Sequence, residues 1–249
     1  MMRRAALAAG VALGGLVALV GVELVVLTRR EFLPMDPGYL VDARVGPADG
    51  APVRLAVLGD STVAGVGAPT EAESLPVLIA ERVAAATGRP VEVRGFGLSG
   101  ARTATVLRDQ LPRLDGGYDA VVLVVGSNDA THATPWPAFR DQAESMLRRA
   151  TEVAPVVVLA GTPRFHANPI IPEPLRTMVD RYSAILRGEQ VAAVGSVPGA
   201  RFVDLAAEAS PRFLDVPEAT SSDGFHPSPI GYGFWADALA PAVIAGLEG

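Results

Sequence analysis

The sequence predicts an α/β protein: a three-layer α/β/α sandwich with a five-stranded parallel sheet, preceded by one N-terminal transmembrane helix. Three observations support this prediction. Short apolar runs alternate with helical patterns from about residue 53 to the C-terminus, as in doubly wound folds. The longest runs are apolar at every position, which is typical of strands covered on both faces. A longer apolar segment, Ala5–Leu27, precedes them and exceeds the roughly 20 residues that span a bilayer as a helix.

The predicted strands are short and rich in valine, leucine and alanine. We place them at Leu55–Leu58, Val91–Val93, Ala120–Val125, Val156–Ala160 and Arg201–Leu205. Because helical patterns separate them, the crossovers between parallel strands are expected to be right-handed. In such open sheets, ligands bind beyond the carboxyl ends of the strands, so the residues that follow each strand are the first candidates for a site.

Five helices are predicted between and after these strands. The first has Ser74 as a capping residue, a proline in its first turn and Gly88 at its end. The second runs from Val106 to Leu114 and stops at two glycines. The other three span about residues 138–150, 175–187 and 232–247. No internal repeat is visible, so residues 53–249 are expected to form one domain, joined to the N-terminal helix by a Pro- and Gly-containing linker at residues 31–52.

Residues 1–30 are predicted to be a membrane anchor or a signal segment. Arginine pairs flank the apolar stretch on both sides, so charge decides its orientation only weakly, and the free amino group favours an extracytoplasmic domain. The rival interpretation is a cleaved signal peptide and a secreted protein. However, the apolar run is longer than the roughly 7–15 residues of a signal h-region, and no small-x-small cleavage site follows it. Glu23 lies near one end, at a depth where a carboxylate is tolerated.

The composition excludes several classes of function. The formal net charge of −6 argues against nucleic acid as a partner, because phosphate binding needs a basic surface. The chain has no cysteine and no lysine, which excludes thiolate nucleophiles, disulfides and Schiff-base chemistry. No histidine and carboxylate cluster has metal-ligand spacing, and no cofactor is implied. Any histidine base must be His132, His166 or His226, and the oligomeric state stays open.

Polar residues follow the predicted strands at places that would meet at one edge of the sheet. Ser61 follows the first strand, Gly100 the second and Asn128 the third, and the pair Asp223 and His226 follows the last. By itself, Ser61 is either a nucleophile or a hydroxyl that caps the next helix. The aspartate and histidine are three residues apart, so the carboxylate can bond one imidazole nitrogen and leave the other to accept a serine proton.

This set meets the needs of acyl transfer by a serine hydroxyl. Such chemistry requires a nucleophile, a base, a group that orients the base, and donors for the oxyanion. Ser61, His226 and Asp223 fill the first three roles. The backbone amides of Ser61 and Gly100 and the side-chain amide of Asn128 are the candidate oxyanion donors. Each piece is weak alone, and the prediction depends on their occurrence in order after successive strands.

The four blocks resemble the SGNH/GDSL hydrolase superfamily, serine hydrolases of the esterase and lipase type. In family order, the matching residues are Ser61 in "LGDSTVAGVG", Gly100 in "GFGLSGART", Asn128 in "VVGSNDA", and Asp223 with His226 in "SDGFHPS". The likeness covers about residues 54–240. At Gly95 the family often has asparagine, which affects loop geometry more than chemistry. The resemblance implies a flavodoxin-like sandwich with strand order 2-1-3-4-5 and hydrolysis of carboxylic esters or thioesters.

A rival nucleophile is Ser99, because Gly97-Leu-Ser99-Gly-Ala101 nearly matches the Gly-x-Ser-x-Gly elbow of α/β-hydrolases. That fold commonly places the triad acid far from the histidine in sequence. Here the best acid candidate, Asp223, stands three residues before His226. Ser61 is therefore preferred.

The remaining polar candidates have simpler interpretations. His132 is expected on a surface loop. His166 belongs to the Pro-rich stretch "TPRFHANPIIPEP", which is either a rigid surface loop or a lid or substrate wall whose apolar contacts are Phe165, Ile170 and Ile171. Asp60 and Asp129 are assigned to turn and cap hydrogen bonds.

The sequence thus predicts a serine hydrolase domain at residues 53–249 that cleaves a small-molecule or lipid acyl ester through an acyl-enzyme, anchored to the membrane by residues 5–27. Two alternatives stay open: a membrane-associated O-acyltransferase that uses the same triad, and a non-catalytic binding domain that kept the fold.

Overall fold

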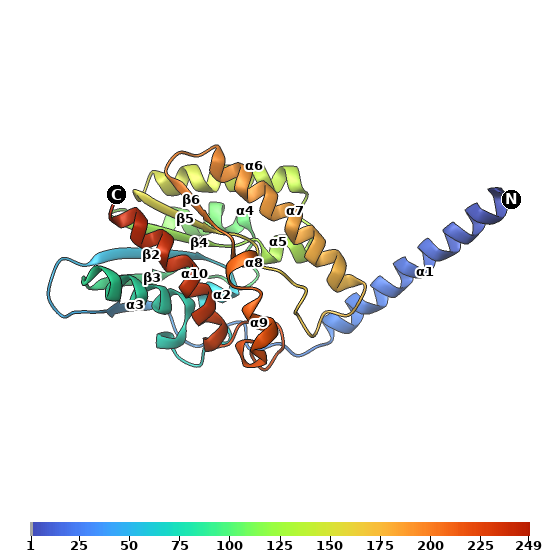
Figure 1. Ribbon diagram of the computed structural model, residues 1–249, viewed down its shortest axis with the longest axis horizontal. Coiled ribbons are helices and arrows are strands. Elements are labelled where there is room, and N and C mark those ends of the chain that lie inside the picture. The colour runs from blue at the N-terminus through green and yellow to red at the C-terminus, as the bar shows by residue number, and fades with distance from the viewer. Residues whose placement is uncertain (1) are drawn as a thin grey trace.

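The computed structural model describes the backbone of residues 2–249 and the side chains from residue 14 onward. Its central sheet lies between two layers of helices, and α1 projects from the domain (Figure 1). The strands are β1 (Asp42–Val45), β2 (Val53–Gly59), β3 (Val91–Gly95), β4 (Ala120–Val124), β5 (Val156–Ala160) and β6 (Ala200–Val203). The last five are the strands predicted from the sequence, with small shifts at their ends.

The sheet is mixed and has six strands, so the prediction of five parallel strands is wrong in this respect. The strand order is β1-β3-β2-β4-β5-β6. Strands β2 to β6 are parallel, and counted from β2 they have the order 2-1-3-4-5 that the resemblance implies. β1 lies within the predicted linker and pairs antiparallel with β3, with Asp42 opposite Arg94. The side chains of β1 are exposed or half-buried, and this edge strand is held mainly by backbone bonds. For this reason no continuous apolar run marks it in the sequence.

The helical elements alternate with the strands along the chain. The long ones are α1 (Met2–Thr28), α3 (Leu75–Thr87), α6 (Trp136–Thr151), α7 (Leu175–Gly195) and α10 (Pro229–Leu247). The short ones are α2 (Ser61–Ala64), η1 (Glu71–Glu73), α4 (Thr103–Thr105), η2 (Val106–Gln110), η3 (Leu111–Arg113), α5 (Ser127–Thr131), α8 (Leu205–Glu208), α9 (Arg212–Asp215) and η4 (Pro217–Ala219).

Two helices differ from the prediction. The helix expected from Val106 to Leu114 is a succession of short segments, among which η2 has π-helical bonding and η3 begins at a leucine-proline pair. Ser74 does occupy the N-cap position of α3, but its side chain makes no capping hydrogen bond. The end of α3 is as expected, since Gly88 adopts the left-handed conformation with φ of 64°.

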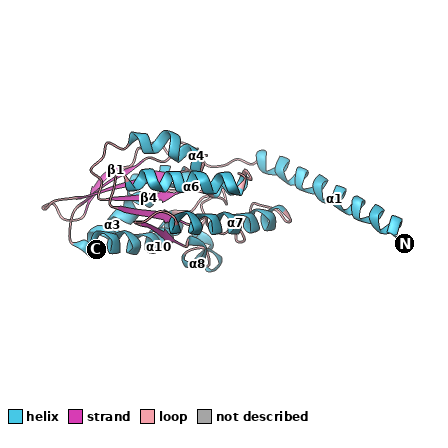
Figure 2. Ribbon diagram, turned by 90° about the horizontal axis from the view of Figure 1, so that it is seen from above, coloured by secondary structure: helices cyan, strands magenta, loops and turns pink. Residues whose placement is uncertain are grey.

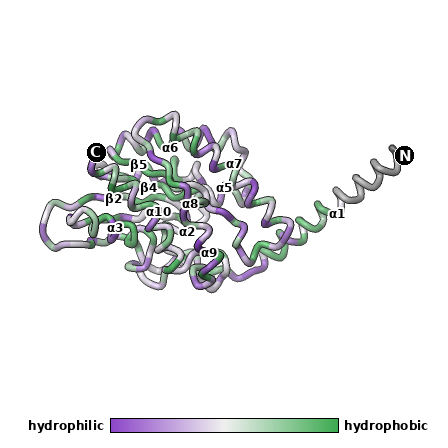
Figure 3. The backbone as a smooth tube through the Cα atoms, in the orientation of Figure 1, coloured by the Kyte–Doolittle hydropathy of each residue, from purple (hydrophilic) through white to green (hydrophobic). Residues whose placement is uncertain are grey.

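Helices cover both faces of the sheet because alternate strand residues point to opposite sides. Leu55 and Val57 pack in a cluster with α3 and α10, whereas Ala56 and Leu58 pack with α6, α7 and η2. All four side chains are fully buried. The two helical layers are visible from above in Figure 2, and the strands between them are mostly hydrophobic in Figure 3.

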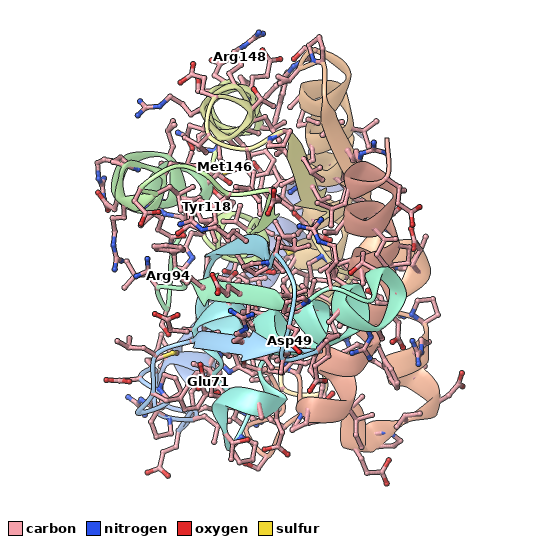
Figure 4. The ribbon with its side chains drawn as sticks, turned by 90° about the vertical axis from the view of Figure 1, so that its left-hand side faces the viewer. Asp49, Glu71, Arg94, Tyr118, Met146 and Arg148 are labelled. Carbon is pink, nitrogen blue, oxygen red and sulfur yellow. The ribbon has the colours of Figure 1, made fainter. Side chains whose placement is uncertain are left out.

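Helix α6 illustrates how each layer faces the core. Its buried side chains recur at helical spacing and are Phe139, Ala143, Met146, Leu147 and Ala150. In Figure 4, Met146 points toward the sheet and Arg148 points away from it. The apolar stripe therefore fixes how α6 lies on the sheet.

The N-terminal segment forms the predicted helix, and its last turns contact the domain. Val20 and Leu27 of α1 pack against an apolar cluster that contains Ile170 and Ile171. Among the residues whose side chains are described, the helix long and apolar enough to cross a membrane is α10, which belongs to the core. The described part of α1 is apolar as well (Figure 3). Its role as a membrane anchor stays a prediction.

Candidate active site

The predicted nucleophile lies at the sharp transition from β2 to α2. Asp60 is the N-cap of α2, and its Oδ1 accepts hydrogen bonds from the Thr62 amide (3.0 Å) and hydroxyl (2.8 Å). Burial raises the pKa of the Asp60 carboxyl, and the Thr62 hydrogen bonds offset this only in part. Asp60 therefore caps the helix, as expected for a turn residue. The Ser61 hydroxyl has no capping role and is free for other contacts.

Ser61, His226 and Asp223 form one continuous hydrogen-bonded chain. The distance from His226 Nε2 to Ser61 Oγ is 3.0 Å, and from His226 Nδ1 to Asp223 Oδ2 it is 2.6 Å. The side chains of the histidine and the aspartate are only 2% exposed. An ionised carboxylate can only accept, so Nδ1 carries the proton and Nε2 has the free lone pair that faces the serine hydroxyl.

The Asp223 carboxylate is held on both oxygens. Oδ1 accepts from the Ser221 hydroxyl (2.9 Å) and from the amides of Phe225 (2.8 Å) and His226 (3.0 Å). Burial alone raises the pKa of this carboxyl, but the hydrogen bonds from His226, Phe225 and Ser221 outweigh burial and lower the pKa to about 2. The group is therefore ionised at neutral pH and fixes the imidazole ring.

Gly67 permits the loop before α10 to lie against the nucleophile loop. It has φ of 97°, and a Cβ at this position would come within 2.2 Å of the Pro227 carbonyl oxygen. The Tyr232 hydroxyl of α10 donates to the neighbouring Val66 carbonyl and joins the same two loops. Only glycine fits both this backbone conformation and this close approach.

Two buried glutamines hold the strand ends below the site, and sequence reasoning missed both. Gln110 clamps the end of β2: its Oε1 accepts from the Gly59 amide (2.9 Å) and its Nε2 donates to the Gly59 carbonyl (2.7 Å). Gln190 binds the Thr162 amide and the Val125 carbonyl after β5 and β4. Each is a polar residue on the core-facing side of a helical segment, which is the signal that could have revealed it.

Of the predicted oxyanion donors, the Ser61 amide and the Asn128 side chain belong to residues that line the cavity. The Asn128 amide nitrogen of α5 donates to the Ala101 carbonyl (3.1 Å) and, at a longer 3.4 Å, to Asp60 Oδ2. Within the described residues, the backbone amides of Ser61 and Gly100 donate to no protein acceptor. Gly100 has φ of 79° and lies on the loop after β3, outside the residues that line the cavity.

A cavity of about 90 Å³ opens beside the Ser61 and His226 side chains. Its apolar wall comes from four aromatic residues, Phe165, Phe213, Phe225 and Trp235. One side is formed by five residues of the Pro-rich stretch, which is therefore a cavity wall rather than a remote surface loop: Pro163, Arg164, Phe165, Ala167 and Asn168. Ile170 and Ile171 are buried behind this wall in the apolar cluster. Among the described residues, no three histidine or carboxylate side chains gather into a metal site.

The other candidates lie apart from this chain of hydrogen bonds. The Ser99 hydroxyl donates to the Met35 carbonyl (2.5 Å) and contacts no histidine, so the alternative nucleophile is not supported. His132 is exposed and bonds the Asn128 carbonyl (2.8 Å). His166 does not line the cavity. Asp129 is buried and accepts from the Thr103 amide (2.9 Å), in agreement with its assignment to loop hydrogen bonds.

Comparisons with known proteins agree with this geometry. The model of the GDSL-like lipase/acylhydrolase family matches residues 57–234. A GDSL-like esterase of Mycobacterium tuberculosis is 31% identical over 190 residues, which cover 75% of this chain but only 60% of that relative. The chain thus spans less than two thirds of that protein. A GDSL lipase of the same organism is 28% identical over 233 residues, covering 88% of this chain and 89% of the lipase.

Solved structures share the fold. An extracellular lipase from Streptomyces rimosus has a TM-score of 0.58 and 21% identity, covering 78% of this chain and 99% of the lipase. An acetylxylan esterase from Geobacillus stearothermophilus has a TM-score of 0.54 and 20% identity, covering 78% of this chain and 95% of the esterase. Since the family model spans most of the domain and the relatives carry the same family name, this chain belongs to the GDSL-like lipase/acylhydrolase family of the SGNH/GDSL hydrolase superfamily, the GDSL-type carboxylesterases and lipases.

Proposed function

We propose that this protein hydrolyses carboxylic esters by two-step acyl transfer, with Ser61 as nucleophile, His226 as general base and acid, and Asp223 as the group that orients the imidazole. The observation that carries the proposal is the hydrogen-bonded chain of these three side chains, at 3.0 and 2.6 Å. Membership of the GDSL family supports an ester bond as the target.

The proposed reaction has two steps, acylation of Ser61 and hydrolysis of the acyl-enzyme, and His226 acts as base and then as acid in both. Ser61 Oγ attacks the ester carbonyl carbon while its proton passes to His226 Nε2. Collapse of the tetrahedral intermediate breaks the ester C–O bond, returns that proton to the leaving alcohol and leaves acyl-Ser61. Water then attacks the acyl group with His226 again as base, which releases the acid and restores the serine. Asp223, with its pKa lowered to about 2, stays ionised and stabilises the imidazolium.

The oxyanion of each intermediate is proposed to bind the Ser61 and Gly100 amides and the Asn128 side chain. The Asn128 amide is already bonded to Ala101 and Asp60. The 3.4 Å contact with Asp60 is the longer one, so it is the bond that Asn128 exchanges for the substrate oxygen. The shorter bond to the Ala101 carbonyl keeps the Asn128 amide in place during this exchange, so little reorganisation is needed when charge develops.

The cavity favours an ester of a small molecule or lipid with a short, apolar acyl group beside Ser61. The cavity has a volume of about 90 Å³ and is lined by aromatic rings. Because this volume is small, a long acyl chain would extend out of the cavity. Helix α1 supports a membrane location, since its described part is apolar and mostly exposed. The proposed extracytoplasmic placement of the domain rests on the charge argument from the sequence alone. Because Val20 and Leu27 pack on the domain, the cavity is held close to the point where the chain would leave the bilayer.

A labelling and turnover experiment tests the proposal. In wild-type protein, a fluorophosphonate probe is expected to label Ser61, and p-nitrophenyl acetate and butyrate to be hydrolysed faster than the decanoate. Ser61→Ala should abolish labelling and lower kcat by more than about 10⁴-fold. Asn128→Ala should lower kcat by about 10²–10³-fold with little change in KM. Ser99→Ala, which removes the rival hydroxyl, should still be labelled. Wild-type turnover in Ser61→Ala would overturn the mechanism.

A further inference from the structure

The chain between α1 and β1 contacts the loop that carries Asp223 and His226. The Leu33 amide donates to Asp223 Oδ2 at 3.4 Å, the same oxygen that accepts the His226 Nδ1 bond. The Phe32 ring meets Phe225 edge-to-face, with centroids 5.8 Å apart and planes at 83°. Phe32 and Leu33 are therefore seated on this loop, within the stretch that the sequence predicted as a linker.

Phe225 lies between Phe32 and the imidazole of His226 and contacts both rings. Its ring lies edge-to-face with His226, with centroids 5.2 Å apart and planes at 80°. Phe32 and Phe225 also join the apolar cluster that contains Ile170. Ile170 in turn presses on the same loop, since its Cγ2 lies 2.5 Å from where a Cβ on Gly224 would stand. The loop is thus enclosed by Phe32 and Ile170.

The preceding helix holds this segment in place. Glu23 of α1 is 5% exposed, and its Oε2 accepts from the amide of Leu175, the first residue of α7 (3.1 Å). A carboxylate at a helix N-terminus is a favourable pairing. Leu27 packs in the same apolar cluster as Phe32. Phe32 therefore reaches Phe225 from an anchored helix end, and not from a mobile tail.

We propose that Phe32 and Leu33 are positioning residues of the active site: they hold the Asp223–His226 loop in the geometry in which the imidazole faces Ser61. This inference rests on the proposed function, because it assigns the N-terminal segment a part in that reaction. The physical reason is that the serine proton can pass only while the imidazole nitrogen stays within hydrogen-bond distance. Loss of the Phe32 contact frees the loop and lowers the fraction of time spent in that geometry.

The test compares substitutions of Phe32 in the full chain. Phe32→Ala removes the ring, Phe32→Leu keeps much of the apolar volume, and Phe32→Tyr keeps the ring. Leu40→Ala is the matched control, because Leu40 lies in the same linker and is 88% exposed. The readouts are KM and kcat for p-nitrophenyl butyrate, with kcat expressed per Ser61 labelled by the fluorophosphonate probe. Counting labelled serine removes the effect of any unfolded fraction.

Phe32→Ala is expected to lower kcat per labelled serine about three- to tenfold, with KM changed less than about twofold. Phe32→Leu should show part of this loss, whereas Phe32→Tyr and Leu40→Ala should match wild type. A merely structural role would lower the labelled amount and leave kcat per labelled serine unchanged, and that result would overturn the inference. If Phe32→Ala does not fold, Phe32→Leu tests the inference in the same assay. A wild-type kcat per labelled serine in Phe32→Leu would then overturn the inference.

The two proposals fail in different ways. If Ser61→Ala is as active as wild type, the proposed function is wrong and the inference falls with it. If Ser61→Ala is inactive and the Phe32 variants keep the wild-type kcat per labelled serine, only the positioning role is wrong.

Discussion

Replacing Asp223 by asparagine changes the active site without changing its shape. Oδ1 of Asp223 accepts three hydrogen bonds, from the Ser221 hydroxyl and from the amides of Phe225 and His226. An asparagine would place its one carbonyl oxygen there and turn its NH2 group toward His226 Nδ1. Since NH2 can only donate, Nδ1 must accept, and the ring proton moves to Nε2.

This tautomer places an N–H group against Ser61 Oγ, where a lone pair is needed at 3.0 Å. The histidine can then no longer accept the serine proton. In a serine triad of this kind, the same substitution lowers kcat by about 10⁴-fold, or about 5.5 kcal/mol in the activation barrier. KM should change little, because Asp223 does not line the cavity.

The assay is p-nitrophenyl butyrate hydrolysis at pH 7, with folding checked by circular dichroism and thermal unfolding. Asp215→Asn is the matched control: it makes the same charge change at an exposed residue and should keep wild-type kcat. Labelling of Ser61 by the fluorophosphonate should slow in parallel with turnover. A folded Asp223→Asn protein that retains more than about one tenth of the wild-type kcat would refute the tautomer argument.

Three further predictions concern stability. Gln110→Leu leaves the buried Gly59 amide unpaired, while the Gly59 carbonyl keeps its bond from the Leu98 amide (3.1 Å). The free energy of unfolding should therefore fall by about 1–3 kcal/mol in urea titration, and an unchanged midpoint would contradict the clamp. Gly67→Ala puts a Cβ 2.2 Å from the Pro227 oxygen and should therefore lower both the melting temperature and kcat. A variant with the wild-type melting temperature and kcat would disprove this prediction. The pKa of Asp223 falls from 3.8 to about 2 on folding, so its stabilisation, roughly 2 kcal/mol, is complete above pH 3.8 and is lost as the pH falls toward 2. Wild type should therefore lose more stability than Asp223→Asn across this window in acid titrations, and parallel curves would contradict it.

Much of the fold could be predicted because burial on both faces leaves a simple pattern. β4 and β5 are buried at every position, and their sequences are continuously apolar. β1 could not be predicted, since its side chains alternate between exposed and half-buried and its stability comes from bonding to β3. The segment η2 also departs from the expected helix, although its apolar spacing is helical.

The sequence by itself determined which chemistry was available. With no lysine or cysteine and three histidines, it left few possible bases, and the Asp-x-x-His spacing singled out His226. Composition and this spacing are local properties, and residues close in the chain express them without the rest of the fold. The order of the parallel strands is not such a property, and it was implied only by the resemblance of the four blocks to a known family.

Only the tertiary structure decided how these groups meet. Ser61 and His226 are separated by 165 positions, and their 3.0 Å contact depends on Gly67 and the Gln110 clamp, which no spacing rule identifies. The same holds for Phe32, which lies in a stretch that reads as linker and yet packs beside the triad acid. Contacts between distant segments arise from packing of the whole domain, so a pattern within one segment does not contain them.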